Sequence, residues 1–209
     1  MIKIRLISFF IFFLSISLSA QKAIQKEYAA EDVQTLSIVD DALFKITVHS
    51  TTEKNIQLSA HISGEHAEEV IIAENLSGKT LSLKTGYTPF LVLENDKLAA
   101  HKVMAIEIEL VVPSTISIEI TSKLAAVTAV GHFKDLSVSI ENANCHLLRF
   151  SGNAHIKTKD GNILVLAENM VSGTAFSENG TAENTLGKHE KYTVVAESVN
   201  GTIKLLQTK

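Results

Sequence analysis

The segment Val199-Asn200-Gly201-Thr202-Ile203 returns in looser form as Glu178-Asn179-Gly180-Thr181 and as Lys159-Asp160-Gly161-Asn162-Ile163. Asn142 and Ser122 hold the same polar position upstream, so this position recurs at steps of 20, 18, 19 and 21 residues. A repeat of about 20 residues is typical of stacked supersecondary units, none of which can bury its apolar surface alone. The period therefore predicts an all-β coil or roll whose laps pack on one another.

Short apolar pairs flank each polar turn, as two short strands per lap require. The pairs that precede a turn are Ile118 and Ile120, Val138 and Ile140, Ile156 and Thr158, and Val194 and Ala196. The pairs that follow are Ala125 and Val127, Cys145 and Leu147, Ile163 and Val165, and Ile203 and Leu205. The fourth repeat is the weakest, with Ala175, Ala182 and Asn184 in the equivalent places.

The polar corners carry the residue types that tight bends need. The predicted structural turns are Asn142, Asp160, Gly161, Asn179, Gly180, Asn200 and Gly201. Glycine accepts a positive φ without steric cost, and Asn or Asp tolerates it. Small residues such as Ala125, Cys145 and Ala182 suit a narrow interior. A meander of hairpins uses the same turn residues, but a period held over five units favours the coil.

The first half of the chain shows a different pattern, strict alternation of apolar and polar residues. Ile106, Ile108 and Leu110 alternate with Glu107 and Glu109, for example. Such alternation places one set of side chains in a core and the other in water, which is typical of antiparallel strands. We therefore expect antiparallel strands over residues 21–112, leading into a right-handed β-coil or roll over residues 113–209. The two parts form a single domain, 21–209.

Residues 1–20 have the three-part plan of a secretory signal peptide. Lys3 and Arg5 precede an apolar run, Leu6–Leu18, and small residues lead to a cleavage position after Ala20. The run is shorter than the approximately 20 residues of a transmembrane anchor, so we expect cleavage and no membrane anchor. The mature protein is then exported to the periplasm, the cell surface or the medium.

The amino-acid composition limits the classes of partner that the protein can bind. Loss of Lys3 and Arg5 with the signal leaves 17 basic and 23 acidic residues, a net charge of −6, with Arg149 as the remaining arginine. This balance excludes a nucleic-acid partner and disfavours an anionic lipid surface. The sequence contains no Trp, and Cys145 is its single cysteine. We expect Cys145 to be a small buried residue, and stability to come from the core.

Residues 86–102 interrupt the strand rhythm with an unusually apolar stretch. Two interpretations stay open. Residues 90–93 form an extra strand at the sheet edge, or the stretch is an exposed loop that docks a partner through apolar side chains. The docking residues would be Tyr87, Phe90, Leu91 and Leu93.

No catalytic, metal or cofactor signature accompanies the repeat. The eight histidines are scattered without zinc-ligand spacing. Glu107 and Glu109 lie on one face of a strand, as glycoside hydrolysis requires of paired carboxylates, but alternation explains them as the wet face of a sheet. Asp160-Gly161-Asn162 lacks the spacing of a calcium loop. We expect no enzyme and no cofactor.

The chain resembles the DUF4097 group of bacterial β-strand-repeat proteins, which are described as adhesin-like. Ala105–Pro113 is similar to the apolar strand ending in Val-Pro that opens that family's repeats, and the glycine corners are similar to its turn-Gly-x-apolar units. The resemblance covers about residues 30–209. It departs at Lys123 and Ala143, which replace corner glycines, and at residues 86–102, which look like an insertion. It implies a right-handed β-coil or roll in the cell envelope and supplies no catalytic residue.

Three functions compete on these grounds. The first is a non-enzymatic binding or adhesin-like module whose partner is a protein or glycan of the cell envelope. The second is a scaffold that forms homo-oligomers by stacking through an open coil end. The third is an enzyme acting on envelope polysaccharide through Glu107 and Glu109.

Overall fold

The computed structural model of this chain describes residues 21–89 and 104–208. Within these ranges the regular structure is β, apart from one 3-10 turn, η1 (Ala67–Glu69). The predicted all-β class is therefore confirmed. The expected signal segment 1–20 and the expected strand over 90–93 lie outside the described residues.

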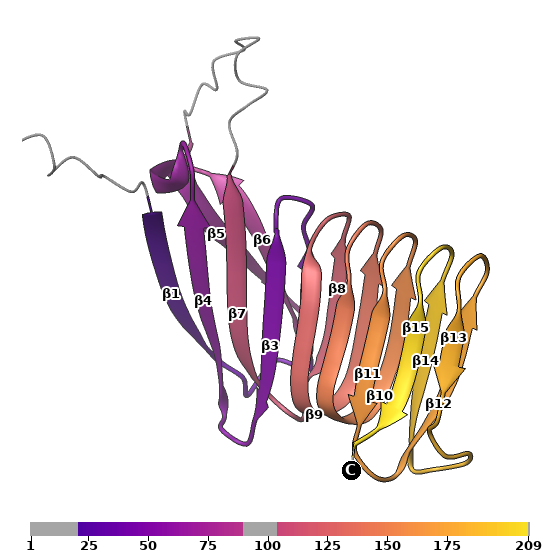
Figure 1. Cartoon of the computed structure of the whole chain (residues 1–209). Coiled ribbons are helices and arrows are strands. Elements are labelled where there is room, and N and C mark those ends of the chain that lie inside the picture. Colours follow the sequence, from indigo (N-terminus) through magenta and orange to yellow (C-terminus); the bar gives the residue numbers. More distant parts are fainter. Residues whose placement is uncertain (1–20, 90–103, 209) are drawn as a thin grey trace, which may run out of the picture.

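The strands of the described chain form one sheet of 15 strands that curls on itself into two facing layers (Figure 1). The layer that faces the viewer in Figure 1 is called the front layer, and the other the rear layer. In order across the front layer lie β1 (Gln21–Ala29), β4 (Asn55–Ser63), β7 (Ala105–Pro113), β3 (Lys45–Thr51), the first half of β9 (Ala126–Ile140), the first half of β10 (Cys145–Thr158), β11 (Ile163–Ala167), β15 (Ile203–Gln207) and β13 (Ala182–Asn184).

We call one circuit of the chain through both layers a lap. Each lap contributes one strand to each layer, so the rear layer follows the same order. It contains β5 (Val70–Ser77), β6 (Thr80–Tyr87), β2 (Thr35–Val39), β8 (Ser117–Ser122), the second half of β9, the second half of β10, β14 (Tyr192–Ser198) and β12 (Val171–Ser177). The long strands β9 and β10 bend from one layer into the other. Glycine permits both bends, with φ of 111° at Gly131 and 130° at Gly152.

Strand direction differs from the sequence expectation. Antiparallel pairing holds for β1 with β4, β4 with β7, and β5 with β6. However, β3 is parallel to β7, and β2 is parallel to both β6 and β8. The prediction of antiparallel strands throughout 21–112 is therefore wrong in part. Consecutive strands such as β2 and β3 lie in opposite layers, so each pairs with a strand of another lap that runs in its own direction.

The laps of the second half do not stack in sequence order. Asn144 accepts a hydrogen bond from Asn162, and Asn162 accepts one from Thr202, 40 residues further on. Thr202 in turn meets Thr181, 21 residues before it. The last lap, β14 and β15, is thus inserted between the lap of β11 and the lap of β12 and β13. This order buries the apolar last lap and leaves the weakest repeat at the end.

The core runs continuously between the two layers. The alternating set Ile106, Ile108 and Leu110 faces inward as predicted and Val112 extends it, whereas Phe44, which alternates with the buried Ile46 and Val48, is 59% exposed. The small residues Ala125 and Cys145 are buried as expected. Ala182 was expected inside and is exposed, because β13 belongs to the terminal lap and no further lap covers it.

Candidate binding surface

The outward face of the front layer carries a row of aliphatic side chains. Val111 on β7, Val130 on β9 and Leu148 on β10 belong to this row, and Leu206 on β15 continues it. The strand registers place them along one line across the sheet: His49 lies between Val111 and Val130, Leu148 pairs with Val130, and Leu166 pairs with Leu206 beyond a register shift in β10. We call this the outer apolar row. Its members, all partly exposed, are Val111, Val130, Leu148, Leu166 and Leu206, and His49 interrupts it between Val111 and Val130.

Polar side chains border the outer apolar row on one side. The next line of the register passes from Glu109 through Thr47 and Thr128 to His146. His49 Nε2 lies 3.5 Å from Glu109 Oε1. An apolar centre with a polar rim is the usual composition of a protein–protein interface.

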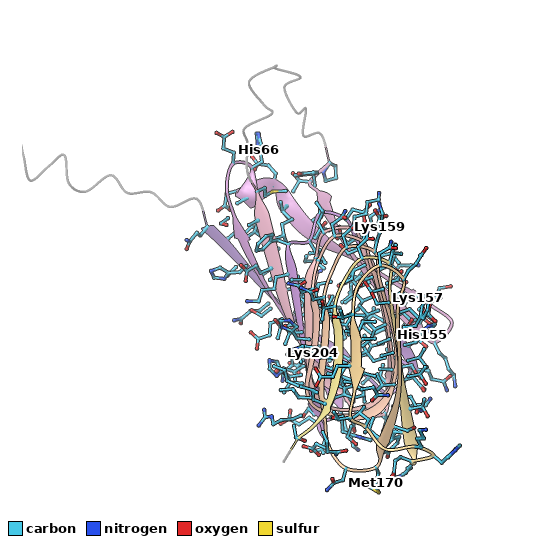
Figure 2. The ribbon with its side chains drawn as sticks, turned by 45° about the vertical axis from the view of Figure 1, so that its right-hand side comes forward. His66, His155, Lys157, Lys159, Met170 and Lys204 are labelled. Carbon is cyan, nitrogen blue, oxygen red and sulfur yellow. The ribbon has the colours of Figure 1, made fainter. Side chains whose placement is uncertain are left out.

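The outward face of the rear layer carries charged side chains, together with Phe176 on β12, which is 63% exposed. In Figure 2, His155 and Lys157 project from this layer, whereas Lys204 projects from the front layer. Lys157 Nζ lies 3.1 Å and His155 Nε2 3.6 Å from the Glu197 carboxylate. Lys157, and then His155, hold the pKa of the Glu197 carboxyl below its usual range. Both outward faces therefore mix charged and apolar side chains, and the aliphatic line is confined to the front layer.

The predicted structural turns lie at the corners that join the layers, along the upper side of Figure 1. Their side chains form a ladder: Asn179 donates to Asn200 Oδ1 (2.9 Å), and Asn200 donates to Asp160 Oδ1 (2.5 Å). Main-chain bonds join Asn200 N to Lys159 O (2.8 Å) and Asn142 N to Lys123 O (2.8 Å). The corners therefore stack on one another in the order of the laps.

Corner glycines serve a purpose different from the one expected. None of Gly161, Gly180 and Gly201 has a positive φ. Instead, a Cβ on Gly161 would overlap the carbonyl of Ala143, a Cβ on Gly201 that of Gly161, and a Cβ on Gly180 that of Gly201. Glycine is required because consecutive corners approach backbone to backbone. The expected role for positive φ at these corners is wrong.

A pocket of about 360 Å³ opens at the upper end of the first half. Val39, Tyr87 and Met104 are among its lining residues. Beneath it the buried Asp40 carboxylate accepts the main-chain N–H groups of Ala42 (2.8 Å) and Thr85 (2.6 Å). Tyr87, one of the four predicted docking residues, is 42% exposed here. The other three, Phe90, Leu91 and Leu93, lie outside the described residues.

Groups with catalytic potential are dispersed over the surface. Glu107 lies beside Lys45 (3.4 Å) in an exposed ion pair, and Glu109 lies beside the exposed His49 ring (3.5 Å). His132 Nδ1 lies 3.3 Å from Ser151 Oγ at an exposed bend. Among residues 21–89 and 104–208, no three His, Cys, Asp or Glu side chains gather as metal ligands would. No helix in the same ranges has the length and apolar character needed to cross a bilayer.

No protein-family model matches the chain, and no curated protein matches it. It is similar in structure to a "putative cell adhesion protein" of Clostridium sporogenes, with a TM-score of 0.64 and 16% identity over 90% of this chain and 100% of that one. Two further solved structures give lower scores. They are a "putative adhesin" of Bacteroides fragilis (TM-score 0.36, 16% identity, 88% and 97% covered) and a "putative lipid binding protein" of Parabacteroides distasonis (0.30, 10%, 91% and 98%).

These likenesses support the fold and no more. At 16% identity the Clostridium sporogenes structure shows that the two chains share an architecture, and the two lower scores carry no argument. The names describe adhesion or lipid-binding proteins and not enzymes. The DUF4097 assignment itself stays a prediction, since no family model matches.

Sequence reasoning missed the outer apolar row. It read Ile163 and Val165 as the apolar pair of their strand and left Leu164 and Leu166 unassigned. A sequence signal for the row exists: residues 163–167 form an uninterrupted apolar run, in contrast to the alternating pattern of the other strands. A strand that is apolar on both faces needs a cover on both faces.

Proposed function

We propose that this chain is a non-enzymatic, adhesin-like binding module of the bacterial cell envelope, and that it binds a protein through the outer apolar row. The proposal includes export directed by residues 1–20. It also includes the finer description of the second half as a right-handed coil that repeats about every 20 residues.

The outer apolar row is the observation that supports a binding role. Five partly exposed aliphatic side chains lie along one line of the front face, interrupted at His49, and grouped apolar side chains on a surface mark interaction sites in soluble proteins. The row contains Val and Leu but no aromatic side chain. Glycan binding usually uses aromatic platforms, so the chemistry of the row favours a protein partner over a glycan.

The alternative of a scaffold that stacks through the C-terminal end of the coil, at β12 and β13, has less support. At the terminal lap, Asn184 Nδ2 donates to the carbonyl of Gly173 (2.7 Å), and Gly187 bridges to Ser172. Strand β13 is only 3 residues long. A short edge strand and side-chain cover are the usual means of preventing edge pairing.

The test compares two double variants of the full chain, purified after expression in a bacterium. Leu148→Gln with Leu166→Gln changes the outer apolar row, and Ser137→Gln with Ser139→Gln changes the rear face as a matched control. Each chain is immobilised and exposed to solubilised envelope extract. We expect a protein retained by the wild type and the control, and at least about tenfold weaker retention by the row variant.

Two treatments of the extract identify the chemistry of the partner. Protease should abolish retention, and periodate oxidation of glycans should leave it unchanged. Retention that survives protease, or that is equal for the row variant and the control, would contradict the proposal.

A further inference from the structure

Strand β1 has one long edge that no strand of the described chain covers. It pairs with β4 along one side only. The main chain of Ala30 donates to Lys54 O (3.2 Å), and hydrogen-bonded pairs alternate along an antiparallel ladder. The even-numbered residues of β1 therefore bond to β4. The odd-numbered residues direct their N–H and C=O groups away from β4, and these are Gln21, Ala23, Gln25, Glu27 and Ala29.

Two other edge strands, β5 and β12, have hydrogen-bond partners along part of their outer edges. Lys22 and Lys26 donate to the carbonyl oxygens of Val70 (2.9 Å) and Ile72 (3.0 Å) on the edge of β5. At the other end of the sheet, Asn184 and Gly187 cover the edge of β12 at Gly173 and Ser172, and the edge strand β13 is only 3 residues long. Within residues 21–89 and 104–208, no hydrogen bond reaches the outward main-chain groups of β1. The outward N–H and C=O groups of five residues along this nine-residue strand form a template for another strand.

We propose that β1 pairs antiparallel with β1 of a second copy of this chain, about a two-fold axis at Gln25. In this register Gln25 faces Gln25 of the other copy, Ala23 faces Glu27, and Gln21 faces Ala29. All of these residues direct their main-chain groups to the free edge, so each pair is a hydrogen-bonded one.

The register is self-complementary in its side chains as well. On the inward face, Ile24 lies opposite Lys26 of the other copy, and Lys22 lies opposite Tyr28. No two like charges stand directly opposite, which would be destabilising. A two-fold contact uses the same surface on both subunits, so a single compatible strand is sufficient. Every second copy of the chain presents the same complementary strand, and for this reason we favour self-pairing over the binding of a foreign peptide. The contact lies apart from the outer apolar row and does not depend on the proposed function.

The first test measures mass by light scattering across a dilution series of the full chain purified from the envelope fraction. The wild type should form a dimer that dissociates on dilution. Gln25→Pro removes one N–H that faces the free edge, at a position where β4 receives no bond, so β1 can remain in place. This variant should be monomeric at concentrations where the wild type is dimeric. Gln25→Thr keeps the N–H and should still dimerise.

The second test reads the register and does not depend on how well the proline variant folds. Facing residues of a hydrogen-bonded antiparallel pair have Cα atoms about 5.5 Å apart, within the range of a disulfide. Gln25→Cys should therefore form an intermolecular disulfide under mild oxidation. Ala29→Cys, which faces Gln21, should not. A wild type that stays monomeric throughout, or equal crosslinking of the two cysteine variants, would overturn the proposal.

Discussion

The ammonium group of Lys22 crosses the end of the molecule and donates a hydrogen bond to the main-chain carbonyl of Val70 (2.9 Å). It also reaches the carbonyl of Glu68 (2.5 Å). Lys26, four residues further along the strand, repeats the arrangement, with Ile72 O and the Glu74 carboxylate both at 3.0 Å. Two inward lysines on β1 thus satisfy the edge of β5 and close the open end of the two layers.

We expect Lys22→Met to lower the free energy of unfolding by about 1–3 kcal/mol, because it leaves two carbonyls without their charged donor while keeping the aliphatic stem. Lys26→Met should behave alike. Lys45→Met is the control, since Lys45 and Glu107 form an exposed pair worth at most about 1 kcal/mol. Urea unfolding followed by circular dichroism measures all three. Equal losses for Lys22→Met and Lys45→Met would show that the lysine bridge contributes nothing special.

The same end of the molecule should respond to acid through Glu74. The Tyr28 hydroxyl, then the Lys26 ammonium, hold the pKa of the Glu74 carboxyl below its ordinary 4.5. The Tyr28 oxygen is buried beside this carboxylate, although it forms no hydrogen bond of ordinary length and angle within the described chain, so we attribute its effect to proximity. Burial, and then Glu74, raise the pKa of Tyr28, which therefore stays neutral across the working range.

A carboxyl whose pKa is depressed by folding stabilises the native state above its unfolded pKa, and this stabilisation is lost as the pH falls through the folded value. The difference in unfolding free energy between the wild type and Glu74→Gln should therefore be constant above about pH 5.5 and shrink below pH 4.5. Urea titrations from pH 7 to pH 3 measure it. A difference that does not change with pH would show that Glu74 is not coupled to Tyr28 and Lys26.

Strand positions were predictable from the sequence because burial follows the period of a strand. Ile106, Ile108 and Leu110 alternate with polar residues, and only one assignment of faces buries all three. The corners were predictable for a similar reason, since Asp160-Gly161 and Asn200-Gly201 interrupt every apolar pattern around them.

The order of the laps could not be predicted in this way. A repeat tells which residues occupy a corner, but not which corner lies beside it, because every corner offers the same backbone groups. The apolar residues Ile203 and Leu205 lie on β15, which has a neighbouring strand on both sides, β11 and β13, because the last lap is inserted before the lap of β12 and β13. Burial of this pair favours the observed order. The edge function of Lys22 was hidden as well, since an alternating lysine reads as solvated until the opposite layer is known.

Close stacking of the corners makes a prediction that separates crowding from backbone conformation. Gly161→Ala should lower stability by about 1–3 kcal/mol, the typical cost of overpacking, because the new methyl group meets the carbonyl of Ala143. Gly180→Ala should cost less, since its corner belongs to the terminal lap and can move outward. Gly86→Ala is the control: its Cβ would meet only Ile71 Cγ1 at 3.7 Å, an ordinary contact.

Thermal and urea unfolding of the three glycine variants provide the comparison. A cost for Gly161→Ala no larger than that for Gly86→Ala would mean that the corners do not approach as closely as described. If the prediction holds, a crystal structure of the Gly161→Ala chain should show the backbone at residue 161 displaced from Ala143.

The single thiol offers a probe of the central laps. Cys145 is fully buried at the start of β10, between Val127 on β9 and Ile163 on β11, and burial raises the pKa of its thiol to about 12. Thiolate is the reactive species, so the native chain should not react with a disulfide reagent such as Ellman's reagent at pH 8. In urea the thiol should react completely. Ser139→Cys places an exposed thiol on the rear face and should react within seconds in the same native chain. If Cys145 reacts as fast as this control, β10 is not held between its two neighbours. If it reacts slowly, at a rate that rises with urea, that rate measures how often the central laps open.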